Sequence, residues 1–187
     1  TFVEMEKEEP DEKTNYIAEA RAAYSPSKVT AYTDRYWNSH NSAYPNFENM
    51  GGDCANFVSQ ALRAGGKSMK GTDASNFSNW FCRTNSTNQL SKVSSTWRGA
   101  DAFGHYWMAN AKKYKKFGAS YFSSADKFKT VYNYGSVGDA ISVLNSNGRP
   151  YHTLIISYKE DGKLKFASHT DNHKWKSLYN YIREGGK

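Results

Sequence analysis

The stretch of sequence that decides the fold covers residues 51–60, which read Gly51-Gly52-Asp53-Cys54-Ala55-Asn56-Phe57-Val58-Ser59-Gln60. The two glycines permit backbone angles that other residues avoid, and aspartate is a residue type favoured at a helix N-cap. Apolar residues then recur at helical spacing as far as Leu62, and Gly65-Gly66 supplies a C-terminal stop. The stretch is therefore typical of a turn that leads directly into a helix.

The predicted helix carries Cys54 in its first turn. Unpaired backbone N–H groups and the positive end of the helix dipole favour a thiolate at such a position, which makes Cys54 a candidate nucleophile. The alternative is a small buried hydrophobe, because free cysteine is among the most buried residue types. The other cysteine, Cys82, follows Trp80-Phe81 and is better explained by packing, although a bridge to Cys54 stays open. We expect two free thiols.

The charge of the chain is divided unevenly. The net charge is +7, but residues 1–12 hold six acidic side chains and one lysine, so they carry −5 and the remainder carries +12. Such a basic body suits an anionic partner, namely nucleic acid, an acidic membrane surface or an anionic cell-wall polymer. No nucleic-acid-binding motif is present, so the wall polymer ranks first. No apolar run is long enough for a membrane span, and no signal-peptide pattern opens the chain, which suggests a mature or excised fragment.

The order of elements predicts one α+β domain over residues 14–187, after a linker or frayed lead-in at 1–13. Helical patterns cover 14–23, 26–38, 54–64 and 97–117, with Ser25-Pro26 as a helix start. The polar loop 67–95 is expected to line a groove and to be anchored by its aromatic residues. Three consecutive antiparallel strands follow at 137–144, 151–158 and 163–169.

A cysteine nucleophile needs a base and a third group that orients the base. His152 opens the second predicted strand and can face a helix packed on the sheet. If the hairpin after Tyr158 has a four-residue loop, His152 lies opposite His169, whereas a two-residue Asp161-Gly162 loop places Asp171 there. The two registers differ by two residues, so both keep the same face, and both alternatives stay open.

The remaining histidines, His40, His105 and His173, lie in predicted loops or on helix surfaces, and we expect them to be solvated or structural. A metal site is the other interpretation of one polar group, made of His152, His169, His173, Asp171 and Asp139. Zinc sites usually show tighter paired spacing on one element, so we expect no metal and no cofactor. Four aromatic residues are candidates either for a substrate groove or for the core: Trp80, Trp97, Tyr106 and Trp107.

At these residues the sequence resembles a known family, the putative amidase domain of bacterial cell-surface proteins, within the papain-like and CHAP amidase group. The resemblance covers roughly residues 26–180. It is carried by 31–38 (AYTDRYWN), 44–47 (YPNF), 51–62 (GGDCANFVSQAL), 136–139 (SVGD), His152 and 169–171 (HTD). Many members have threonine where this chain has Ala55.

The resemblance implies a papain-like α+β fold in which the catalytic helix packs on an antiparallel β-sheet. It also implies Cys54 as nucleophile, His152 as base and His169 as the orienting group, with Asp171 as the alternative. The backbone N–H of Cys54 would contribute to an oxyanion hole.

The implied activity is hydrolysis of an amide bond in peptidoglycan, by an amidase or a stem-peptide endopeptidase. The implied protein is a bacterial monomer, secreted or associated with the cell wall, whose partner is peptidoglycan or another anionic wall polymer. Two competing functions remain: a non-catalytic wall-binding module on the same fold, and an acyl transferase or protease that uses the same cysteine and histidine.

Overall fold

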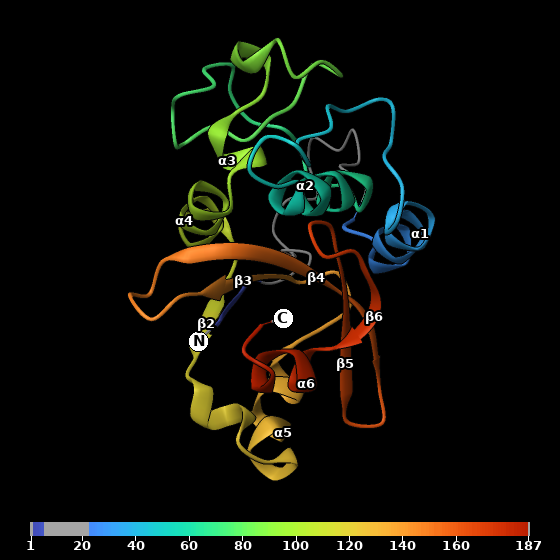
Figure 1. Cartoon of the computed structure of the whole chain (residues 1–187), viewed down its shortest axis with the longest axis vertical. Coiled ribbons are helices and arrows are strands. Elements are labelled where there is room, and N and C mark those ends of the chain that lie inside the picture. The colour runs from blue at the N-terminus through green and yellow to red at the C-terminus, as the bar shows by residue number, and fades with distance from the viewer. Residues whose placement is uncertain (1, 6–22, 187) are drawn as a thin grey trace, which may run out of the picture.

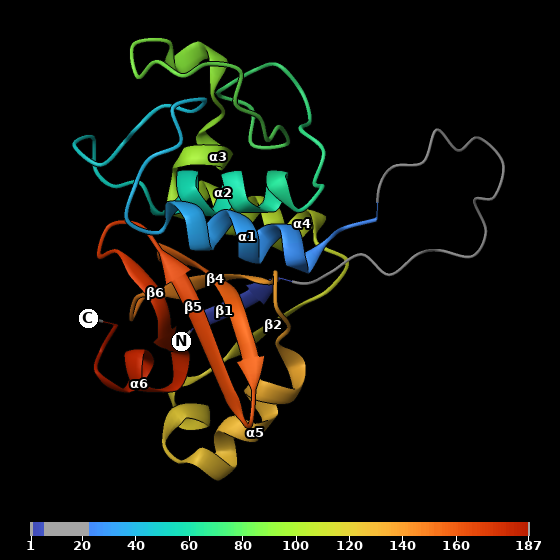
Figure 2. The same cartoon turned by 90° about the vertical axis from the view of Figure 1, so that its right-hand side faces the viewer.

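The computed structural model describes residues 2–5 and 23–186, and it shows a mixed α+β protein with a central antiparallel sheet. Helices α1, α2 and α4 cover one face of the sheet, with α3 packed against α2 and α4, and helices α5 and α6 cover the other face (Figures 1 and 2). Each face has its own hydrophobic core. Sheet residues Ala140, Leu144, Ile155 and Ala167 pack with the first group of helices. Sheet residues Ile141, Val143, Leu154, Ile156, Leu164 and Phe166 pack towards α5 and α6.

The helices on the first face follow the predicted pattern. Helix α1 (Pro26–Tyr36) begins after Ser25, whose hydroxyl accepts from the N–H of Lys28, and proline occupies the first turn as expected. Helix α2 (Cys54–Ala64) is almost enclosed, because nine of its 11 residues are buried. The helix ends before Gly66, whose φ of +115° is a backbone angle that glycine adopts readily. The predicted helix start at Cys54 is confirmed.

The helix predicted over 97–117 is wrong in its last third, residues 111–117. Helix α3 (Ser95–Arg98) and helix α4 (Ala100–Asn110) are followed by strand β2 (Tyr114–Phe117). Strand β2 contains two lysines, and all of its side chains except that of Phe117 are exposed. A strand with one buried residue gives almost no periodic signal in the sequence.

The sheet has six strands in the order β2-β1-β3-β4-β5-β6. The three predicted strands are confirmed as β3 (Ala140–Leu144), β4 (Pro150–Glu160) and β5 (Lys163–Ser168), and β6 (His173–Ser177) extends one edge. Strand β1 (Phe2–Met5) pairs with both β2 and β3. Part of the expected lead-in is therefore a strand, whereas residues 6–13 and nearly all of the helix expected at 14–23 lie outside the described residues.

Two further helices, α5 (Ala125–Tyr134) and α6 (Leu178–Arg183), cover the second face, together with a 3₁₀ turn at Ala119–Phe122. Another 3₁₀ turn, Leu90–Lys92, lies within the polar segment 67–95. The polar segment 67–95 is held to the body by buried Trp80 and Phe81 and by a β-bridge between Cys82 and Val93. Phe77, which we expected to be an anchor, is 66% exposed.

The hairpin between β4 and β5 selects between the two registers left open by the sequence. Glu160 pairs with Lys163, and the loop residues Asp161 and Gly162 have φ of 49° and 73°. These angles belong to a two-residue type I′ turn. The four-residue loop is therefore excluded.

A β-bulge then changes the face of every later residue. Between Ile156 and Tyr158 the register shifts by one, so Ile156 pairs with Phe166, and the last pair is Ile155 with Ala167. Because side chains alternate along a strand, a one-residue shift undoes the expectation that both registers keep one face. Strand β4 continues past this pair without β5 beside it, and this open edge includes His152 and Thr153. Among the described residues, no helix is both long and apolar enough to span a bilayer.

Candidate active site

Cys54 is the first residue of α2 and is 8% exposed. Burial raises the pKa of its thiol, and the neighbouring Asp53 acts in the same direction. The backbone and hydroxyl of Thr153, together with the backbone of Ala55, lower the pKa but do not outweigh burial. The helix start was expected to favour a thiolate; burial acts against this effect and raises the pKa of the thiol.

Asp53 stands at the N-cap position of α2 but does not cap it. Its Oδ1 accepts from the backbone N–H of Phe47 at 2.9 Å and from Asn56 Nδ2 at 2.8 Å. Its Oδ2 lies 2.7 Å from His169 Nδ1. The buried carboxylate thus fastens the loop before α2 to the helix and to the turn after β5.

His169 is buried against the same side of α2. Its ring stacks on Phe57 with centroids 4.0 Å apart, and its Nε2 lies 2.6 Å from the carbonyl oxygen of Tyr36. Asp53 and this carbonyl engage both ring nitrogens, and no hydrogen bond or ring contact joins His169 to His152 among the residues described. The structure therefore corrects the expected placement of His169 opposite His152, since the bulge and the end of β5 carry it towards α2.

His152 faces the opposite layer of the molecule. It pairs with Val143, which belongs to the core beneath α5 and α6, and its ring lies 6.4 Å from that of Tyr181 in α6. Burial lowers the pKa of its imidazole to about 4; Asp171 opposes this shift and His173 adds to it. His152 is therefore neutral at pH 7. Its Nε2 is buried and accepts or donates no hydrogen bond within residues 2–5 and 23–186.

Cys54 and His152 come from different layers, but they share neighbours at the open edge of β4. Thr153, whose backbone and hydroxyl act on the Cys54 thiol, is the residue after His152. Tyr181 lies near both, because its pKa responds to the charges of Cys54 and Asp171 while its ring neighbours His152. No hydrogen bond joins Cys54 to His152 in the described part of the chain. The two groups share one neighbourhood without being paired.

The turn after β5 brings Asp171 towards His152. Thr170 and Asp171 have φ of 56° and 67°, and the Ser168 hydroxyl donates to the Asp171 carbonyl at 3.0 Å. The Thr170 hydroxyl accepts from the backbone N–H of Asp53 at 2.8 Å, which ties this turn to the start of α2. Asp171, rather than His169, is the polar group that acts on the His152 ring.

The sequence does not predict that three further residues lie near the site. His173 opens β6, where its ring packs edge-on to Phe166 and Tyr181, and Tyr181 lies in a helix that had no predicted counterpart. His40 lies beside Asp53. His105, by contrast, is exposed as predicted, with 61% of its side chain accessible. The four aromatic residues considered for a groove, Trp80, Trp97, Tyr106 and Trp107, are all buried and form core.

These features define a mixed α+β protein with a buried cysteine at a helix start and a neutral histidine at an adjacent sheet edge. The chain belongs to the family described as "Putative amidase domain", whose model matches residues 23–186. The Bacillus subtilis (strain 168) protein named "Uncharacterized protein YhbB" is 31% identical over 146 residues. That match covers 78% of this chain but 40% of the length of the relative. No solved structure matches the chain.

The two cysteines provide a test of the local environment. Both are free, as expected, and both are buried. Because burial raises the pKa of Cys54, we expect slow alkylation at pH 7 and a rate that rises about tenfold per pH unit up to and beyond pH 9. The measurement is iodoacetamide labelling of the Cys82→Ala variant from pH 6 to 10. A fast rate that levels off below pH 7 would indicate a resting thiolate instead. Denatured, unreduced wild-type protein should titrate as two thiols.

Proposed function

We propose that the protein is a cysteine-dependent amide hydrolase with a papain-like arrangement, as the amidase family suggests. The observation that carries the proposal is that the Cys54 thiol lies beside Thr153, the β4 residue next to the neutral His152, and that Tyr181 lies near both groups. A nucleophile needs a base close to it, and β4 has no β5 partner at His152 and Thr153.

The mechanism begins from a neutral thiol and a neutral imidazole, since burial disfavours the charged form of each. His152 takes the thiol proton as Cys54 Sγ attacks the amide carbonyl, and the oxyanion is stabilised by the backbone N–H of Cys54. The imidazolium then protonates the leaving amine as the C–N bond breaks. Water, deprotonated by His152, hydrolyses the thioester and restores the thiol. The Asp171 carboxylate favours the imidazolium in each step.

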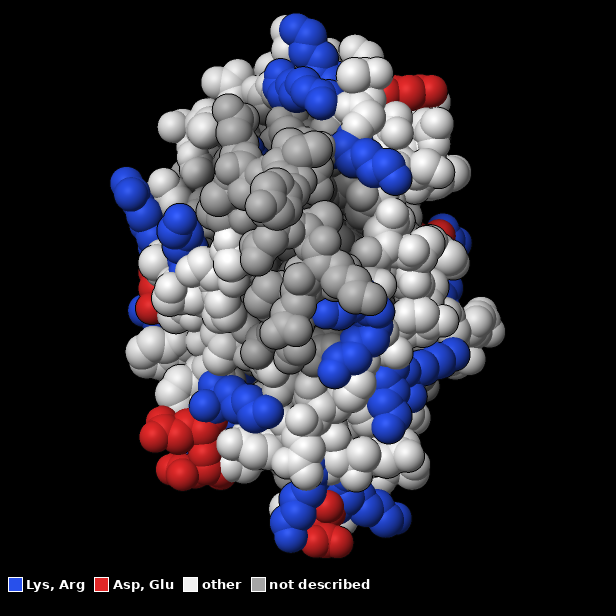
Figure 3. Space-filling view, turned by 180° about the vertical axis from the view of Figure 1, so that it is seen from behind, with Lys and Arg blue, Asp and Glu red and all other residues white. Residues whose placement is uncertain are grey.

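The substrate class we propose is an amide bond of peptidoglycan, in a secreted or wall-associated setting. Charge supports an anionic polymer, because the chain carries +12 beyond residue 12. Figure 3 shows Lys and Arg side chains spread over one face, with Asp and Glu confined to small areas. Steering by a basic surface raises the local concentration of an acidic polymer.

The test is digestion of purified peptidoglycan, with mass spectrometry of the released fragments. New amino and carboxyl ends, absent with the Cys54→Ala variant, would support hydrolysis and would identify the bond that is cut. A wall-binding module would sediment with peptidoglycan and release no fragments. An acyl transferase would release fragments only when a second amine is supplied.

His152 also gives an acid-stability prediction. Its pKa is about 4 in the folded state and 6.5 ordinarily, so the unfolded state binds more protons between these values. The contribution of His152 to the free energy of unfolding is therefore fully present above pH 6.5. It is lost as the pH drops towards 4, and the loss amounts to about 3 kcal/mol. We expect the Tm to decline over this window, and to decline less in His152→Gln. His105→Gln is the matched control on an exposed histidine, and equal slopes in all three proteins would contradict the assignment.

A further inference from the structure

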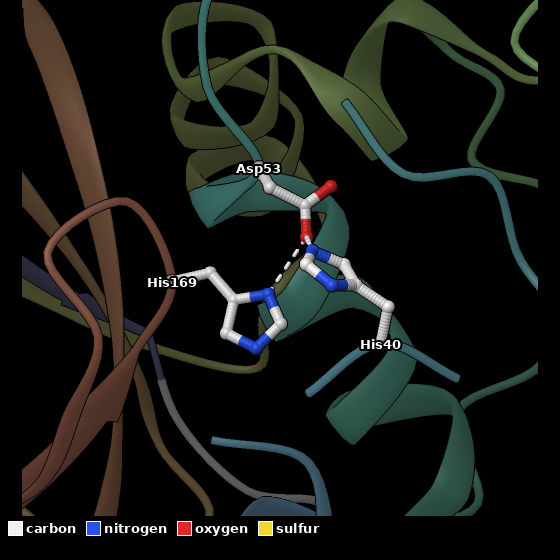
Figure 4. A group of neighbouring side chains, drawn as sticks. All are labelled: His40, Asp53 and His169. Atoms are coloured by element: carbon white, nitrogen blue, oxygen red, sulfur yellow. Dashed lines mark hydrogen bonds and ion pairs between the residues drawn. The ribbon is translucent and has the colours of Figure 1, made fainter. Parts of the chain in front are cut away.

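Two histidine side chains converge on one carboxylate oxygen of Asp53, beside the start of α2. His169 Nδ1 lies 2.7 Å and His40 Nε2 lies 3.7 Å from Asp53 Oδ2. Figure 4 shows both rings turned towards the carboxylate, and the two ring centroids are 5.0 Å apart. The potential ligand atoms of all three residues lie within 4.8 Å of one another.

The groups behind this cluster already hold it in place. His169 Nε2 faces the Tyr36 carbonyl, which can only accept, so this nitrogen carries a proton and donates it. Donation from one ring nitrogen to a backbone carbonyl is the usual support of a metal-bound histidine, because it leaves the other nitrogen's lone pair free to bind. Asp53 is fixed in a similar way, through Oδ1, by Phe47 and Asn56.

Two imidazole nitrogens approach the same carboxylate oxygen, His169 Nδ1 at 2.7 Å and His40 Nε2 at 3.7 Å. A hydrogen bond with His169 alone accounts for the first contact, whereas the approach of His40 to the same oxygen is the arrangement that a cation would use.

We propose that His40, Asp53 and His169 bind a divalent transition metal of the zinc type. Two imidazoles and one carboxylate are ligands that zinc accepts at about 2.0–2.2 Å, which in a tetrahedral site sets the ligand atoms about 3.3 Å apart. The observed 2.7 and 3.7 Å lie on either side of that spacing, and all three ligand atoms lie within 4.8 Å of one another. The His40 side chain is 31% exposed and its Nε2 lies 3.7 Å from Glu48 Oε2, so water or Glu48 would be the fourth ligand.

The consequence of binding is mechanical rather than catalytic. The metal would join the loop after α1, the residue that precedes Cys54 and the turn that carries Asp171. It would therefore hold together the three segments that place the candidate nucleophile and the group acting on His152. This site is independent of the proposed hydrolysis, because Cys54 and His152 do not belong to it.

The experiment is calorimetric titration of metal-stripped protein with Zn²⁺, alongside the visible absorption of the Co²⁺ form. We expect one ion per chain, tetrahedral Co²⁺ bands, and a Tm that rises with Zn²⁺ concentration. His40→Ala, on an accessible loop, should lose at least about tenfold in affinity and should lose the Co²⁺ bands, since it removes a direct ligand. Asp53→Asn should weaken binding as well, and circular dichroism would report whether that variant is folded.

Two matched variants separate this site from other metal binding. His105→Ala removes an exposed histidine elsewhere and should bind Zn²⁺ as the wild type does. Cys54→Ser should also bind normally, so the result does not depend on the hydrolytic mechanism. The proposal is overturned if no stoichiometric Zn²⁺ binds, if His40→Ala binds as tightly as the wild type, or if Cys54→Ser loses the site.

Discussion

Replacing Cys54 with alanine is expected to abolish amide hydrolysis while leaving the fold intact. The thiol is the attacking atom, and removal of a nucleophile that acts with its base as a unit costs several orders of magnitude in kcat. Alanine is compatible with the first turn of α2. Cys54 is a small residue and only 8% exposed, so its replacement by alanine removes little buried volume. The measurement is the rate of peptidoglycan hydrolysis, with Tm recorded for the same preparation.

The matched control for this variant is Cys82→Ala. Cys82 is also free and buried, its Sγ lies 3.4 Å from the carbonyl oxygen of Thr84, and burial raises the pKa of its thiol too. Loss of a small side chain at either position should lower the Tm by a similar amount, but only the change at Cys54 should stop hydrolysis. If Cys54→Ala retained more than about a tenth of the activity, a cysteine mechanism could not hold.

The sequence predicts well those parts of the fold whose signals are local. Helix α1 follows from Ser25-Pro26, and helix α2 follows from the two glycines and the buried periodic face. The two hairpins that join β3, β4 and β5 follow from Asn-Gly and Asp-Gly turns with apolar runs around them. In each case the residues that terminate an element are adjacent in sequence to those that form it.

Other parts depend on contacts that no local pattern encodes. Strand β1 at Phe2–Met5 acquires its role only by pairing between β2 and β3. The bulge at Ile156–Tyr158 shifts the register by one residue, and this shift decides which histidine faces which layer. The balance at Cys54 between burial and the helix start is likewise a property of the packed state. The sequence therefore predicts the residue types of the site, but it does not predict which contacts each residue makes.

The second large effect concerns substitutions of three polar residues, which should differ in whether they lower catalytic activity or thermal stability. His152→Ala should lose at least about a hundredfold in kcat/KM, because the group that carries the proton in both chemical steps is gone. Asp171→Asn should be impaired but measurable, since its carboxylate only favours the imidazolium form of His152. His169→Ala should mainly lower the Tm, as it removes the hydrogen-bond partner of Oδ2 in the buried Asp53 carboxylate. The measurements are kcat/KM on a soluble peptidoglycan fragment, and Tm, for all three variants.

The pH profile distinguishes positioning from structural damage in this series. Asp171 raises the pKa of His152, so Asp171→Asn should lower that pKa further and move the acidic limb of kcat/KM to lower pH. A variant that merely loosened the turn after β5 would lower the rate at every pH and leave the limb in place. The four-residue hairpin would have made Asp171 the least important of the three for activity, whereas the two-residue turn places Asp171 before His169 and leaves His152 first. If His169→Ala lost more activity than Asp171→Asn at an unchanged Tm, His169 would be the orienting group, and the contacts that fix it to Asp53 and Tyr36 would have to be exchanged during catalysis.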